Sequence, residues 1–198
     1  MNRPASEKSA LENLFAPGPL VLAGMIVVAA LTRLLPHPPN FSPVEAMALF
    51  GGAYFASKRW AFFVPLAGML ISDIALAGIN GGLYSTWFGS AGIWVVYLCV
   101  ALTTALGLNL RGRVNGARVL GYSLVGSVLF FVVTNFASWA FQVTPTYPMT
   151  AAGLGAAFVA GIPFFQWTVL GTLFYAALLF GGFALLRQRV PALRMQTV

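Results

Sequence analysis

Residues 60–79 of the chain read WAFFVPLAGMLISDIALAGI, an apolar run with a single charged residue, Asp73. A run of this length and composition is typical of a transmembrane α-helix, because about 20 residues of helix cross the hydrocarbon core of a bilayer. The whole chain has the same character: 59% of its 198 residues are hydrophobic, 8% are charged, and its mean hydropathy is +0.84. A soluble domain needs more surface charge, and a disordered chain has fewer apolar residues. The sequence therefore predicts an all-α integral membrane protein.

Further apolar runs extend the prediction to six transmembrane helices. They are expected at residues 19–35, 43–57, 60–79, 86–108, 119–141 and 163–186. The run at 43–57 is short for a bilayer. Residues 151–160 are expected to form a separate short helix, at the membrane surface or partly re-entrant, because Pro163 and Gln166 interrupt the last apolar stretch. One transmembrane domain, 19–186, is thus expected between an N-terminal segment, 1–18, and a basic tail, 187–198.

Lysine and arginine residues lie in the segments between the apolar runs. When these segments are assigned alternately to the two sides of a membrane, ten of the eleven cationic residues fall on one side and Arg33 falls on the other. The positive-inside rule then places both termini in the cytoplasm. The cations do not form a continuous basic face, so the net charge of +7 does not indicate nucleic-acid binding.

The opposite, external side collects aromatic and polar residues, including the single histidine and both acids outside the N-terminal segment. Ionisable groups at membrane depth are costly and often mark a ligand or a pathway. We therefore expect a cup that opens outward and binds a small molecule between polar groups and aromatic rings. The candidate ligand-binding residues are His37, Asn40, Phe41, Glu45, Asp73, Asn80, Tyr84, Trp87, Trp139 and Tyr147.

Several of these residues also have a structural interpretation, and the sequence leaves both open. Glu45 follows Ser42-Pro43, a typical helix start, where an acid stabilises the helix N-terminus. Asp73 is also explained as a structural ion pair with Arg33, and the tryptophans as part of an aromatic belt. The segment 36–43 has four prolines in eight residues and is expected to be a stiff loop. Such rigidity lowers the entropic cost of binding.

The chemistry of an enzyme is missing from the sequence. One histidine and one cysteine do not supply the converging ligands of a metal centre, and Cys99 lies in an apolar run where we expect it to be buried. A Gly-rich nucleotide loop ending in Gly-Lys does not occur either. We therefore expect no catalytic residue, metal or cofactor.

Several motifs resemble a family of uncharacterised bacterial six-helix membrane proteins. They are RLLPHPPNF at 33–41, EAMALFGGAYF at 45–55, Ser72-Asp73, VVTNF at 132–136, YPMT at 147–150 and GIPFF at 161–165. That family is similar to the S-components of energy-coupling-factor (ECF) transporters, which bind vitamins. The resemblance implies a six-helix bundle in the bacterial inner membrane, with both termini inside, that captures a vitamin-like micronutrient from outside.

The resemblance leaves the energy source open. S-components typically carry Ala-x-x-x-Ala in the first helix for docking on the ECF transmembrane subunit, whereas this chain has Gly24 and Val28 there. The expected partners are the bilayer and the ligand. In one alternative the protein also binds the ECF transmembrane and ATPase subunits, and in the other it is a solitary importer of the cobalamin type. A different class of function, a non-transporting membrane scaffold or assembly protein, also stays open.

Overall fold

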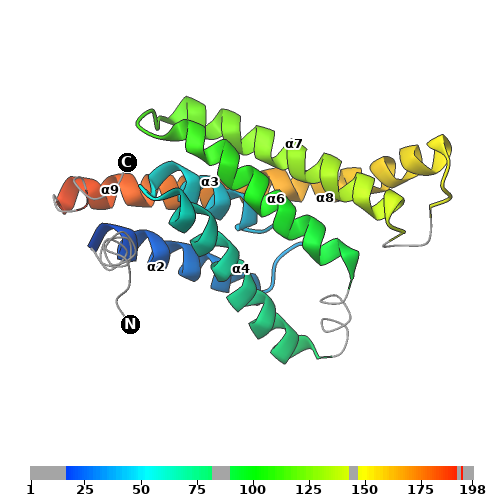
Figure 1. Ribbon diagram of the computed structural model, residues 1–198, viewed down its shortest axis with the longest axis horizontal. Helices are drawn as coiled ribbons and strands as arrows, with labels where there is room; N and C mark the ends of the chain where they lie inside the picture. Colours follow the sequence, from blue (N-terminus) through cyan, green and yellow to red (C-terminus); the bar gives the residue numbers. More distant parts are fainter. Residues whose placement is uncertain (1–16, 82–89, 143–146, 191–192, 194–198) are drawn as a thin grey trace, which may run out of the picture.

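The computed structural model describes residues 17–81, 90–142, 147–190 and 193, and these residues form helices, turns and loops without a β-strand (Figure 1). The helices are α2 (Pro17–Leu31), α3 (Val44–Tyr54), α4 (Lys58–Asn80), α6 (Ala91–Gly107), α7 (Gly116–Ala140), α8 (Ala151–Ala176) and α9 (Gly182–Arg189). Two 3₁₀ turns, Thr32–Leu34 (η1) and Leu108–Leu110 (η2), extend α2 and α6, and a π-helical turn, Ala177–Gly181 (η3), joins α8 to α9. The predicted all-α class is confirmed for these residues.

Five helical segments are long and apolar enough to cross a membrane, as in a multi-pass membrane protein. They are Pro17–Leu34, Lys58–Asn80, Ala91–Leu110, Gly116–Ala140 and Ala151–Arg189. The remaining predicted span, 43–57, is the short helix α3. Its 11 residues cover about 16 Å at ~1.5 Å per residue, whereas the 23 residues of α4 cover about 34 Å.

Helix α3 forms the centre of the bundle. All of its residues are buried, and it packs against α2, α4, α6, α7 and α8. Two glycines let α3 and α6 touch: a side chain on Gly52 would meet the backbone at Thr104, and one on Gly107 would meet the backbone at Leu49. Small residues permit this close approach between membrane helices. The neighbouring helices therefore enclose α3 and shield it from lipid.

The last apolar stretch differs from the prediction. We expected Pro163 to separate a surface helix from a final span, but α8 runs without a break from Ala151 to Ala176 with Pro163 inside it. The physical reason is packing on both sides of the proline. Phe131 of α7 contacts Phe158 before it and Phe165 after it, with ring centroids 5.6 and 4.8 Å apart. Neighbouring helices can hold a proline-containing helix together in this way.

The described cations other than Arg33 gather at one end of the bundle. They lie at the start of α4, in the connection from α6 to α7, at the start of α7 and at the end of α9, close to where α2 begins (Figure 1). Arg111, in the connection from α6 to α7, binds the end of α3. Its guanidinium donates hydrogen bonds to the carbonyl oxygens of Gly52, Phe55 and Ala56 at 3.0, 2.6 and 3.3 Å. These bonds satisfy carbonyl groups at the end of α3 that have no partner within that helix.

Candidate functional site

A cavity of about 500 Å³ lies where α3 begins. Helix α3 is much shorter than its neighbours, so its first turn lies inside the bundle. The space beyond the N-terminal end of α3, between the longer helices, is this cavity, called here the cavity above α3. The chain reaches this point through the loop that follows η1. The cavity is lined by Arg33, His37, Asn40, Ser42, Val44, Glu45, Met69, Asp73, Leu76, Val96 and Phe130.

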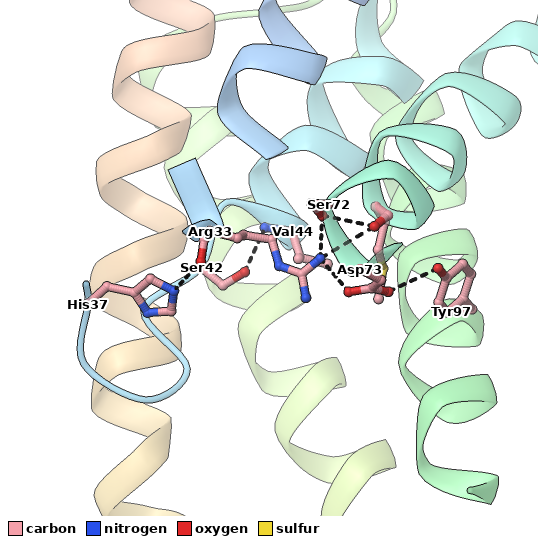
Figure 2. Close-up of polar contacts among 8 residues, drawn as sticks. Arg33, His37, Ser42, Val44, Ser72, Asp73 and Tyr97 are labelled. Carbon is pink, nitrogen blue, oxygen red and sulfur yellow. Dashed lines mark hydrogen bonds and ion pairs between the residues drawn. The ribbon is translucent and has the colours of Figure 1, made fainter. Parts of the chain in front are cut away.

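An ion pair forms one wall of the cavity (Figure 2). Arg33 Nη1 lies 2.7 Å from Asp73 Oδ1, and the carboxylate is almost wholly buried, with 1% of its side chain exposed. The same guanidinium nitrogen donates to Ser72 Oγ at 2.5 Å, and the Tyr97 hydroxyl donates to Asp73 Oδ2 at 3.0 Å. The predicted pairing of Asp73 with Arg33 is confirmed. A buried pair needs such additional hydrogen bonds to offset its loss of hydration.

Glu45 supplies a second buried carboxyl group. It lies in the first turn of α3 and is 3% exposed. The positive end of the helix favours a carboxylate there. Thr172 of α8, also buried, lies beside the carboxyl group. One arginine, two acids and one histidine line the cavity, so its side chains sum to a net charge of −1 when both acids are deprotonated and the histidine is neutral.

The proline-rich loop covers this end of the cavity with a defined conformation. The Phe41 backbone N–H donates to the Pro38 carbonyl oxygen at 3.0 Å, closing a turn with Pro39 and Asn40 at its centre. Asn40 has φ +65°, so the turn has the pattern of type II, with proline and then asparagine at the central positions. Asparagine tolerates this left-handed conformation better than most residues. The expected non-helical loop is confirmed.

Two contacts fix the loop to the rest of the protein. Phe41 packs against Phe174 and Tyr175 of α8, with ring centroids 5.7 and 5.9 Å apart. At Gly171, one turn before them, a Cβ atom would lie only 2.7 Å from the Ser42 backbone nitrogen. A glycine is therefore needed on α8 for the loop to approach. This docking positions the side chains of the loop at the cavity.

His37 is held by backbone carbonyl groups at the edge of the cavity. Its Nδ1 lies 2.9 Å from the Pro38 oxygen. Its Nε2 lies 3.3 Å from the Arg33 oxygen (Figure 2). A neutral imidazole can donate only one of these hydrogen bonds, whereas a protonated imidazole can donate both. The ring is exposed.

The structure brings together four of the predicted site residues: His37, Asn40, Glu45 and Asp73 all line the cavity. Phe41 lies behind them and anchors the loop. Asn80 is exposed at the end of α4 and does not line the cavity. Tyr84 and Trp87 lie outside the described residues.

Trp139 and Tyr147 lie elsewhere, the first at the end of α7 and the second shortly before α8 begins. The Trp139 indole N–H donates to the Pro148 carbonyl oxygen at 3.0 Å, and Gln142 Nε2 donates to the Tyr147 carbonyl oxygen, also at 3.0 Å. The α7–α8 hairpin extends beyond the ends of the other helices (Figure 1), which carries this connection away from α3. The Trp139 side chain and the Tyr147 backbone therefore bond within the hairpin, and neither residue lines the cavity.

Sequence reasoning did not select several residues that matter at the cavity. Tyr97 binds the Asp73 carboxylate from α6, and Met69, Val96 and Phe130 form the apolar part of the wall. The signal for Tyr97 was weak but present, because it places a hydroxyl group inside an apolar run. The apolar residues gave no signal, since a lining position and a core position have the same composition.

A smaller cavity of about 170 Å³ adjoins the first. Asn40 and Phe130 line both cavities, and the smaller one continues between α7 and α8 past Thr134 and Asn135. The Asn135 amide N–H donates to the Phe131 carbonyl oxygen at 2.7 Å. The cavity above α3 thus has a side pocket that contains hydroxyl and amide groups.

Within the described part of the chain, no three His, Cys, Asp or Glu residues lie close enough together to hold a metal ion. Cys99 is buried, as predicted, in the middle of α6.

Comparison with known proteins identifies a family but no activity. The family description that matches the chain is "Family of unknown function (DUF6580)", and the match covers residues 13–193. No curated protein and no solved structure matches the chain. The function must therefore be inferred from the cavity and its residues.

Proposed function

Because the chain belongs to the DUF6580 family of unknown function, its activity has to be argued from the site, and we propose that it is a transport protein that captures a small organic micronutrient. The observation that carries the proposal is the cavity above α3, where the single histidine, two buried acids and a partly buried arginine converge. Membrane proteins seldom place ionisable groups at such depth without a ligand, an ion or a partner.

The dimensions of the cavity fit a small organic ligand. Its volume of about 500 Å³ lies within the ~300–1,000 Å³ range of small-molecule sites. Polar groups occupy one side and the apolar side chains of Met69, Leu76 and Val96 occupy the other. Such a division suits a ligand with an apolar body and a few hydrogen-bonding groups, as vitamins have. Cobalamin is one candidate, and it would extend well outside a cavity of this size.

The charges of the cavity favour a ligand with a hydrogen-bond donor or a positive charge. Arg33 is already bound by Asp73 and Ser72, so Glu45 is the carboxyl group that a ligand can complement. A cationic or donor group beside Glu45 would offset the cost of burying that carboxylate. A strongly anionic ligand would face repulsion from the Glu45 carboxylate, whose charge no arginine compensates.

The direction of capture follows from the charges at the two ends of the bundle. The described cations other than Arg33 gather opposite the cavity, and by the positive-inside rule this favours a cavity that faces outward, with both termini in the cytoplasm. We further propose six crossings, with the loop 35–43 and α3 together forming the second, in the inner membrane of a bacterium. Resemblance to ECF S-components supports this topology. Both a solitary importer and one coupled to ECF subunits are compatible with it.

Ligand-dependent stabilisation of the purified protein tests this proposal. A ligand that binds only the folded state raises the unfolding temperature, by an amount that grows with its concentration. We expect at least one compound in a panel of vitamins and their precursors to stabilise the wild type. E45Q should lose most of that shift because the amide cannot form an ion pair, whereas N109D, an exchange at an exposed position near the basic end, should retain it.

Two outcomes would contradict the proposal. One is a panel in which no compound stabilises the wild type, which would favour the scaffold alternative. The other is a compound that stabilises E45Q as strongly as the wild type, which would place its binding site away from the cavity.

A further inference from the structure

A larger cavity lies at the basic end of the bundle and shares no lining residue with the cavity above α3. Its volume is about 920 Å³, and it lies between the first half of α7 and the segment formed by the end of α8, η3 and α9. Tyr54, at the end of α3, also lines it. Nothing in the proposed capture of a ligand at Glu45 uses this space.

The walls of this cavity are largely apolar and reach the outer surface of the bundle. Leu120 of α7 lines the cavity and is 49% exposed, and Ala177 and Ala184 on the opposite wall are also exposed. Exposed apolar side chains on a transmembrane helix face lipid acyl chains. The cavity is therefore accessible to hydrocarbon from the side.

The end of the cavity nearest the start of α7 and the end of α9 is positively charged. Arg187 lines it, with its guanidinium carbon 5.8 Å from the centre of the Tyr54 ring. Arg118 and Arg189 directly neighbour the lining residues Val119 and Gln188 in the sequence. Among the described residues no aspartate or glutamate lies at this end, because the two described acids, Glu45 and Asp73, line the other cavity. The local potential therefore attracts an anionic group.

A buried hydroxyl group faces the same space. Ser123 lines the cavity, is fully buried, and its Oγ has no hydrogen-bond partner within the described part of the chain. An unsatisfied buried hydroxyl is unfavourable, so a bound molecule with an acceptor group would relieve this cost. The opposite wall contains the π-helical turn η3, and such turns occur frequently at functional sites.

We propose that this cavity binds an anionic phospholipid. One acyl chain would occupy the apolar part between α7 and η3, the phosphate would lie beside Arg187, and an ester oxygen would be available to Ser123. Apolar walls open to the bilayer, a cationic rim and a buried donor match the three parts of such a lipid. Basic pockets between transmembrane helices at the cytoplasmic surface are suited to anionic headgroups.

Native mass spectrometry of the detergent-purified protein with added lipid tests the proposal. The probes are phosphatidylglycerol, which is anionic, and phosphatidylcholine, which is zwitterionic, with identical acyl chains. We expect phosphatidylglycerol to bind more tightly. R187Q should lower its affinity about fivefold relative to phosphatidylcholine, as expected for one arginine near a charged headgroup. R113Q, which removes an exposed charge at the same end but outside the cavity, should change this ratio much less.

A second variant tests the cavity itself without altering any charge. A184W places a large side chain at an exposed lining position and should weaken binding of both lipids, whereas A117W, at an exposed position on α7 outside the lining, should not. The ratio between the two lipids is insensitive to a partial loss of folded protein. Equal binding of both lipids to the wild type, or undiminished phosphatidylglycerol binding to A184W, would overturn the proposal.

Discussion

Arg33 and Asp73 compensate each other inside the bundle, and their shared hydrogen bonds hold both side chains in place. Ser72 binds the guanidinium and Tyr97 binds the carboxylate, so helices α4 and α6 and the turn η1 are joined through one polar cluster. This cluster fixes the wall of the cavity, while Glu45 keeps a carboxyl group at its centre. Under the proposed function, Asp73 has a positioning role and Glu45 recognises the ligand.

Removal of the Asp73 charge should destabilise the protein strongly. In D73N the buried guanidinium of Arg33 loses its counter-charge, and breaking a buried pair in this way costs about 3–5 kcal/mol. Thermal or denaturant unfolding in detergent measures the change. Y97F, which removes one hydrogen bond to the same carboxylate, should cost less, about 1.5–3 kcal/mol. A D73N protein as stable as the wild type would show that the pair is not buried.

Helix α8 holds the loop 35–43 in position at the cavity. The loop supplies His37 and Asn40 to the cavity, and its position depends on the packing of Phe41 and on the space at Gly171. The site is therefore built on a proline-rich turn that an adjacent helix holds in one conformation. A loop fixed in this way loses little entropy when a ligand binds.

G171A should displace this loop. The added methyl group would lie 2.7 Å from the Ser42 nitrogen, so either the loop or α8 must move. We expect a loss of about 1–3 kcal/mol of stability, together with a smaller ligand-induced shift in unfolding temperature. G155A on the same helix, where a Cβ meets nothing within 4 Å, is the matched control. It should be neutral or slightly stabilising, since alanine favours helix. Equal behaviour of the two variants would contradict the docking role of Gly171.

The sequence predicts these elements to different extents. Four prolines within 36–43 exclude a helix there, and Ser42-Pro43-Val44-Glu45 predicts the start of α3, because both are local properties of the backbone. The continuity of α8 through Pro163 depends on Phe131 of another helix, which no local pattern reveals. Trp139 and Tyr147 lie at the end of the bundle opposite the basic end, as the apolar runs predict. How far the α7–α8 hairpin projects there depends on packing, which the sequence pattern does not reveal.

At the scale of the whole molecule, the two ends of the bundle differ in charge and in the chemistry of their cavities. The end that includes Arg111 and Arg187 is basic, and the opposite end contains both described acids. Counting cations between apolar runs predicts this division, because topology depends on the sum of charges rather than on exact helix bounds. The central position of α3 was not predictable in this way, since its enclosure requires knowledge of five neighbours.

Cysteine labelling in intact cells tests the orientation. In a C99A background, N80C at the end of α4 should react with a membrane-impermeant maleimide, whereas R113C at the basic end should react only after the cells are permeabilised. Both positions are exposed, so burial does not limit the reaction. The reverse pattern would place the cavity above α3 toward the cytoplasm and exclude capture from outside.

The central claim, that the cavity above α3 holds a small organic molecule, is tested most directly by mass spectrometry of what the purified protein releases on denaturation. The account predicts that protein purified from cells in rich medium releases one organic compound at close to one mole per mole, and that E45Q purified in parallel releases much less. Release of no such compound from the wild type, or of equal amounts from E45Q, would contradict it.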